Sequence, residues 1–228
     1  NNELVFNSSR GPTNDGRIKP DICAPGQGNM STGKDNTYQA GGGTSAASPV
    51  IAGAAALIYE AYQEQEEGNS PPSGLVKAMI LCSAEDLGRK GPDYLYGWGR
   101  INYSRALEVL QEDQYVIDNI AHGYQDYHQI IIPEGVGQAR VMVYWMDPAG
   151  SILSSKALVN DIDISLQNSD GQTYLPHVLS HYPNYDSLTT PAYRGQDHVN
   201  NMEEVILDNP GQGSYTLRVK GHLIPEGP

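Results

Sequence analysis

The residues from Gly41 to Gly53, GGGTSAASPVIAG, have the composition of a nucleophile segment. Glycines ahead of Ser45 permit backbone dihedrals that a Cβ would forbid, and they let a substrate backbone come close. From Ala46 to about Gln63 the chain is apolar on nearly every side, which predicts a buried helix, and we expect Pro49 in its first turn. Ser45 would then lie at a helix amino terminus, whose unsatisfied N–H groups can stabilise an oxyanion. The alternative is that Ser45 only caps the helix.

Three separate blocks decide between these interpretations. Residues 43–49 resemble the nucleophile motif of the subtilisin-like serine peptidases, the subtilases. Residues 7–26, with their NSSRGPT, DGRIKPD and APG segments, resemble the block that precedes the nucleophile in that family, and GWGRIN at 97–102 resembles its segment before the last helix. Three blocks in the right order are far more specific than one short motif. The resemblance implies a serine endopeptidase that hydrolyses peptides or proteins through an acyl-enzyme, with Ser45 as nucleophile and no cofactor.

The second half of the chain also resembles a known domain. LVNDID at 158–163, NNMEEV at 200–205 and IPEGP at 224–228 are similar to the jelly-roll domain of the KP-43-like branch of alkaline subtilases. The resemblance therefore covers nearly the whole chain. It implies a secreted or periplasmic protein.

Two members of the expected catalytic triad are missing. The subtilase order is Asp, His, Ser, yet neither an Asp-Thr-Gly-like nor a His-Gly-Thr-like motif occurs, and all six histidines follow Ser45. Because a serine without a base is a weak nucleophile, we expect this chain alone to be inactive. Its expected partner is the missing amino-terminal part of the same catalytic domain. The alternative is a non-catalytic protein on a subtilase scaffold, with a carbohydrate- or protein-binding β-sandwich.

The pattern of elements predicts two domains. Residues 1–112 are expected to form the carboxy-terminal half of an α/β subtilisin-like domain, with helices at 46–63, 72–84 and 104–111 and an extended segment at 17–24. Residues 113–228 are expected to form an all-β antiparallel jelly-roll or sandwich, because strands at 140–145, 161–167 and 215–220 follow without intervening helices.

Charge and composition exclude two classes of partner. The net charge of −13 argues against nucleic acid, since phosphate binding needs clustered Lys and Arg. The longest uncharged apolar run, Ser45 to Tyr59, is shorter than the ~20 residues that cross a bilayer, so no membrane partner is expected.

Aspartates in the second half suggest a metal. Asp161 and Asp163 alternate on one strand face, and we place Asp147, Asp186 and Asp197 in loops. Carboxylates and loop carbonyls suit Ca²⁺, and the subtilase resemblance also implies calcium binding, so a structural Ca²⁺ is a candidate ligand. The alternative is a solvated acidic face.

Overall fold

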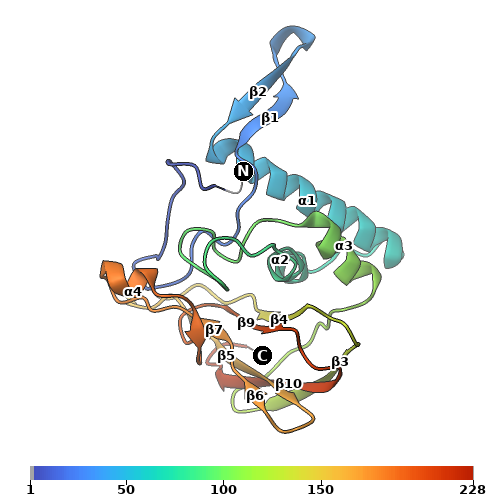
Figure 1. Ribbon diagram of the computed structural model, residues 1–228, viewed down its shortest axis with the longest axis vertical. Coiled ribbons are helices and arrows are strands. Elements are labelled where there is room, and N and C mark those ends of the chain that lie inside the picture. Colours follow the sequence, from blue (N-terminus) through green and yellow to red (C-terminus); the bar gives the residue numbers. More distant parts are fainter. Residues whose placement is uncertain (1–2, 228) are drawn as a thin grey trace. The chain divides into compact units, whose positions relative to one another are not determined.

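Three α-helices pack around one apolar core in the computed structural model, which describes residues 3–227 (Figure 1). They are α1 (Thr44–Gln65), α2 (Ser73–Cys82) and α3 (Tyr103–Gln111). Helix α3 begins where the Asn102 side chain accepts a hydrogen bond from Arg105 N, at 3.1 Å. The buried residues of this core are Ile58, Tyr62, Leu75, Val76, Met79, Ile80, Ala106 and Leu110.

Helix α1 corrects two expectations. It was expected to be buried, but of its 22 residues only Ala54, Ile58 and Tyr62 are, whereas Leu57 is 48 % exposed. The reason is that α2 and α3 cover one side of the helix only. Pro49 was expected in the first turn, but it is the sixth residue of α1, where its missing N–H removes the hydrogen bond to the Ser45 carbonyl.

A two-stranded antiparallel hairpin leads into α1. It consists of β1 (Gln27–Thr32) and β2 (Tyr38–Gly42), with a short 3-10 turn, η1 (Lys34–Asn36), between the strands. In Figure 1 the hairpin extends away from the three helices. Because Gly43 follows β2 directly, the hairpin fixes where α1 starts.

The expected extended segment at 17–24 does not form a strand. Only a short stretch of it pairs, where Cys23 forms a parallel bridge to Arg100 and Trp98 N donates to Asp21 O at 3.0 Å. The imino acid Pro20 has no N–H to donate, which limits the pairing to these few residues. Gly97 is required at this contact, because a Cβ there would lie 2.0 Å from the Pro20 carbonyl oxygen.

The second half of the chain consists mainly of antiparallel strands. The largest sheet has the order β3-β10-β5-β6, while β4 pairs with β9 and β7 pairs with β8. The strands are β3 (Gln125–Ile132), β4 (Gln138–Tyr144), β5 (Asp161–Asn168), β6 (Thr173–Tyr174), β7 (His177–Val178), β8 (Tyr193–Arg194), β9 (Met202–Asp208) and β10 (Gly213–Leu223). A short helix, α4 (Tyr185–Thr189), lies between β7 and β8.

A second apolar core joins two of these sheets. It takes residues from β3, β5 and β10 in the four-stranded sheet and from β9 in the pair β4-β9. Its buried members are Ile132, Ile164, Leu166, Val205, Leu207, Tyr215 and Leu217. The second half is therefore an antiparallel β structure with its own core, in a chain that mixes helix and sheet.

The contacts divide the chain into two compact units. Unit 1 comprises 1–11, 19–88 and 93–115, and unit 2 comprises 12–18, 89–92 and 116–228. Two short segments from the first half, 12–18 and 89–92, thus belong to unit 2. The expected domains, 1–112 and 113–228, stay a prediction. Residues 1, 2 and 228, the last of which ends the IPEGP motif, lie outside the described part of the chain.

Candidate active site and acidic cluster

Ser45 is the second residue of α1 and is exposed. The N-cap of the helix is Gly43, so the structure does not support the interpretation of Ser45 as a cap. Gly43 has φ 99°, in the region that favours glycine, and its N–H donates to Gly26 O at 2.6 Å. The turn from β2 into α1 therefore presents Ser45 on the surface of unit 1.

The backbone around Ser45 is suited to hold an anion. The first hydrogen bonds of α1 run from Ala46 N and Ala47 N to Gly43 O, at 3.0 and 3.3 Å. The N–H groups of Thr44 and Ser45 precede these bonds, and first-turn N–H groups have no acceptor within the helix. Together with the positive end of the helix dipole they favour negative charge beside Ser45.

Unit 1 contains no histidine, the residue type that most often serves as a general base. All six histidines belong to unit 2 by sequence position. In unit 1, Asp21 forms ion pairs with Lys19 and Lys77, and these cations lower the pKa of its carboxyl against the opposing effect of burial. Burial raises the pKa of the Cys23 thiol, so Cys23 is not an activated nucleophile.

The loop aspartates of the calcium prediction have other roles. Asp147 accepts hydrogen bonds from Val159 N and Asn160 N, at 2.8 and 2.7 Å. Asp197 accepts from the backbone of Val199 and Asn200, at 2.8 and 3.0 Å. Asp186 lies in the first turn of α4 rather than in a loop, and it is exposed. These three carboxylates do not converge on one point.

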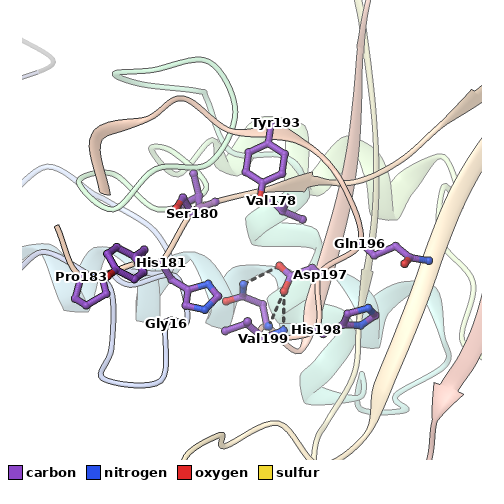
Figure 2. Close-up of a pocket in the computed structure, with 13 residues that line it drawn as sticks. Gly16, Val178, Ser180, His181, Pro183, Tyr193, Gln196, Asp197, His198 and Val199 are labelled. Atoms are coloured by element: carbon purple, nitrogen blue, oxygen red, sulfur yellow. Dashed lines mark hydrogen bonds between the residues drawn. The ribbon is translucent and has the colours of Figure 1, made fainter. Parts of the chain in front are cut away.

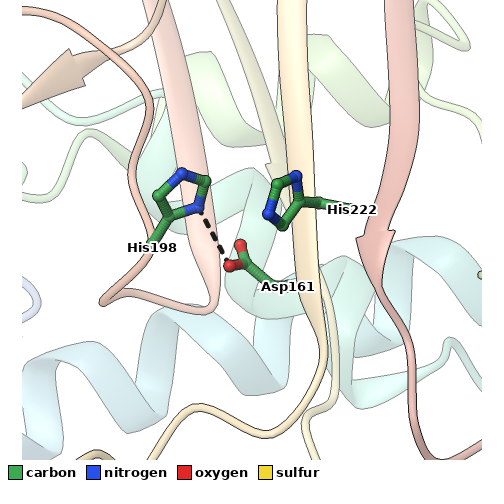
Figure 3. A group of neighbouring side chains, drawn as sticks. All are labelled: Asp161, His198 and His222. Atoms are coloured by element: carbon green, nitrogen blue, oxygen red, sulfur yellow. Dashed lines mark ion pairs between the residues drawn. The ribbon is translucent and has the colours of Figure 1, made fainter. Parts of the chain in front are cut away.

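Asp161 and Asp163 do come together, and two histidines join them. His198 Nδ1 lies 2.9 Å from Asp161 Oδ2 and 3.7 Å from Asp163 Oδ1, while His222 Nδ1 lies 3.1 Å from Asp163 Oδ2. Figure 3 shows the two imidazoles on either side of Asp161. We call these four residues the Asp–His cluster. Its nitrogen donors do not match the shell of six to eight oxygens that Ca²⁺ takes.

Sequence reasoning missed both histidines of this cluster. His198 and His222 are 24 positions apart in the chain, and no metal-binding spacing connects them to the aspartates. His198 and His222 meet the aspartates because β10 pairs with β5 and the loop before β9 returns to the same end of the sheet. A prediction of these two histidines would have required the strand register.

Two buried glutamates lie behind the cluster on β9. Glu203 accepts hydrogen bonds from Ile164 N at 2.7 Å and Asp197 N at 3.2 Å, and burial raises its pKa to about 9. Glu204 is fully buried and forms a two-pronged ion pair with Arg140, at 2.7 and 3.1 Å. Both carboxyl groups are held by specific donors.

A hollow of about 400 Å³ opens beside the cluster in unit 2. Val178, His181, Tyr193, Asp197 and His198 are among its lining residues, and Figure 2 shows the Asp197 carboxylate bonded to the loop rather than aimed outward. The Asp197 carboxylate in this lining accepts hydrogen bonds from Val199 and Asn200.

Comparisons with known proteins agree with the motif at Ser45. Residues 1–99 match the family model Peptidase_S8, the subtilase family. The chain is 27% identical over 257 residues to the Serine protease/ABC transporter B family protein tagA of Dictyostelium discoideum, covering 95% of this chain and 14% of that protein. It is 40% identical over 82 residues to the C5a peptidase of Streptococcus pyogenes, covering 35% of this chain and 7% of that protein.

A solved structure is also similar. The crystal structure of the serine protease of Aeromonas sobria aligns with 82% of this chain and 38% of its own, at 16% identity and a TM-score of 0.31. The chain spans a small part of the two curated relatives, 14% and 7%. None of the helices within residues 3–227 has the length and apolar character needed to span a membrane.

Proposed function

We propose that this chain is the nucleophile-bearing, carboxy-terminal part of a subtilisin-like serine endopeptidase. The observation that carries the proposal is the placement of Ser45 in the first turn of α1, directly after the positive-φ Gly43, within residues that match the subtilase family. Its substrates are peptides or proteins, and the hydrolysis needs no cofactor.

In this proposal Ser45 Oγ attacks the carbonyl carbon of the scissile peptide bond. The Ser45 N–H, which has no acceptor within α1, helps hold the tetrahedral oxyanion. A histidine takes the Ser45 proton and returns it to the leaving amine, and an aspartate orients that histidine. Unit 1 contains no histidine, so we assign the base and its aspartate to a polypeptide segment outside this sequence.

The partner that completes the site is the amino-terminal part of the same catalytic domain. The exposed apolar side of α1, which includes Val50 and Leu57, is the surface of unit 1 that such a part could cover. We further propose that unit 2 is the jelly-roll domain of the KP-43-like branch, and that the protein acts outside the cytoplasm. The antiparallel core of unit 2 supports the first of these statements.

Active-site labelling tests the proposal directly. A fluorophosphonate is applied to the longer native protein and to this 228-residue chain, and the modified residue is mapped by mass spectrometry. We expect label on Ser45 in the longer protein and none in the isolated chain. Ser45→Ala should abolish labelling and peptide hydrolysis, because it removes the attacking oxygen.

Ser48→Ala is the matched control. Ser48 is exposed in the same helix, three positions further on, and its loss should leave labelling intact. A folded longer protein that takes no label at Ser45 would falsify the catalytic proposal.

A binding role for unit 2 is the second candidate. Two tyrosines, Tyr182 and Tyr193, line the same hollow and are 67 % and 53 % exposed. Exposed aromatic rings can stack on sugars or peptides, while Trp145 is bonded through its indole N–H to Asn160 O. Oligosaccharides are titrated into the parent chain and into the Tyr193→Ala variant, and binding is followed by tyrosine fluorescence. This measurement separates the binding role of unit 2 from catalysis.

A further inference from the structure

We propose that the Asp–His cluster of Asp161, Asp163, His198 and His222 is a binding site for one divalent transition-metal ion of the Zn²⁺ type. The site lies wholly within unit 2, and it is independent of Ser45 and of the proposed peptidase function.

Distances within the cluster suit a small ion. One ligand atom each from Asp161, His198 and His222 can be chosen so that all lie within 4.8 Å of one another. The pairs that include Asp163 are separated by 3.1 and 3.7 Å, and the Asp161–His198 pair by 2.9 Å. Around tetrahedral Zn²⁺ with bonds near 2.0–2.1 Å, neighbouring ligand atoms lie about 3.3 Å apart. The observed separations lie on both sides of that value.

Unsatisfied polar atoms provide a second, independent observation. Asp161 Oδ1 and Asp163 Oδ1 are both buried and make no hydrogen bond within the described chain. Buried polar atoms are nearly always bonded, and two such oxygens in one cluster are unusual. The residues that carry them, Asp161 and Asp163, are only 4 % and 8 % exposed. A cation in the cluster would give these buried carboxylates a partner.

The donor types select the class of metal. Two imidazoles and two carboxylates form a mixed nitrogen and oxygen set, and imidazole suits Zn²⁺ and its transition-metal neighbours. Ca²⁺ and Mg²⁺ prefer oxygen ligands. Both histidine side chains are 40 % exposed, so the ion can enter from solvent.

The fold fixes each ligand. Asp161 and Asp163 alternate on β5, and β10 has a bulge in which Gly221 opposes Ile162 and Leu223 opposes Asp161. His222 is the extra residue of this bulge, which brings its ring beside the aspartates; bulges commonly re-aim side chains in this way.

The fourth ligand comes from the loop before β9. The neighbouring Asp197 holds this loop by accepting from the backbone N–H groups of Val199 and Asn200 and from Asn200 Nδ2, the last at 2.7 Å. The His198 ring is thereby kept 4.7 Å from the ring of His222, centroid to centroid. Asp197 is a positioning residue for the site.

The competing explanation is charge pairing without a metal. Protonated histidines would neutralise the aspartates, and Lys156 Nζ lies 3.9 Å from Asp161 Oδ2. Lys156 is 41 % exposed and too distant for a hydrogen bond, and the unbonded Asp161 Oδ1 gains nothing from it. The two explanations differ in whether a divalent metal changes the stability of the protein.

Metal titration decides between them. The purified chain is stripped with a chelator and titrated with Zn²⁺ and separately with Ca²⁺ by calorimetry, and its thermal unfolding is followed with and without each ion. We expect one Zn²⁺ per chain and a Tm increase of about 5–10 °C at a hundredfold excess over Kd. Substituted Co²⁺ should show the visible absorption of a tetrahedral site.

Three variants locate the ion. Asp161→Asn preserves the side-chain shape and should weaken Zn²⁺ binding at least about a hundredfold, as should His222→Ala, because each removes a ligand. His128→Ala replaces a histidine of β3 outside the cluster and should bind as the parent does. The Tm of Asp161→Asn without metal, compared with that of the metal-free parent, shows whether the variant is folded.

Three results would overturn the proposal. They are a folded chain whose Tm no Zn²⁺ concentration changes, Zn²⁺ binding that Asp161→Asn leaves intact, and binding of Ca²⁺ in preference to Zn²⁺. The first indicates charge pairing alone, the second a site elsewhere, and the third an oxygen-ligand site.

Discussion

Helix α1 and strand β9 have opposite relations between residue type and burial. Helix α1 is rich in Ala, with Val, Ile and Leu interspersed, yet only three of its 22 residues are buried. Strand β9 contains two consecutive glutamates, yet six of its seven residues are buried, and Glu204 has no exposed surface. Each element does the reverse of what hydrophobicity alone predicts.

The difference shows that burial here depends on what each element packs against. Glu203 and Glu204 are buried because a backbone amide of β5 and the guanidinium of Arg140 meet them at hydrogen-bonding distance. Leu57 is exposed because no element of unit 1 lies over that side of α1. Variants that remove the packing partner of a residue therefore test this comparison of α1 with β9.

The largest effect should come from removing the partner of a buried charge. Arg140→Ala leaves Glu204 buried without its cation, and breaking such a pair costs about 3–5 kcal/mol of unfolding free energy. Urea denaturation of the parent and the variant measures the loss.

The double variant Arg140→Met with Glu204→Met is the control. It replaces both charges by apolar side chains of similar length and should recover most of the lost stability. A single Arg140→Ala variant as stable as the parent would mean that β9 tolerates an unpaired charge, and the comparison with α1 would fail.

The next effect is a loss of stability in acid. His177 on β7 is 8 % exposed, and burial, with the nearby charge of Arg194, lowers its pKa from 6.5 to about 4. The unfolded chain takes up a proton between these two values and the folded chain does not. The contribution of neutral His177 is therefore complete above pH 6.5 and is lost as the pH falls toward 4, by about 2–3 kcal/mol.

Denaturation at pH 7 and pH 4.5 measures this loss. His177→Gln, which cannot be protonated, should flatten the stability profile in this range, whereas His128→Ala should keep the parent slope. An unchanged slope in His177→Gln would show that another group causes the acid sensitivity.

Much of the fold could be predicted from local pattern. The helices at α2 and α3 follow from apolar spacing and from the opening residues Pro72 and Asn102, and β4, β5 and β10 follow from period-two alternation. The prediction of an extended segment at 17–24 failed because the backbone hydrogen bonds of Asp21 and Cys23 go to residues 98–101, about 80 positions away, which no local pattern encodes.

The two candidate sites also differ in whether local sequence pattern could predict them. Ser45 could be found because its glycines, small residues and helix are contiguous in sequence. The Asp–His cluster could not, because His198 and His222 reach Asp161 through strand register and a β-bulge. Local motifs point to the proposed nucleophile, and tertiary pairing assembles the proposed metal site.

The smallest loss of stability should come from Leu57, an exposed position on α1, measured against its buried neighbour Ile58. Ile58→Ala, at a position with no exposed surface, should cost about 2–5 kcal/mol, while Leu57→Gln, at a position that is 48 % exposed, should cost under about 1 kcal/mol in this chain. Denaturation midpoints of both variants give the comparison. Under the proposed function, an amino-terminal part of the domain would cover Leu57 in a longer protein, and the same Leu57→Gln change should there cost about 1–2 kcal/mol. Equal small costs in both proteins would show that this side of α1 stays exposed, and that the partner binds unit 1 elsewhere.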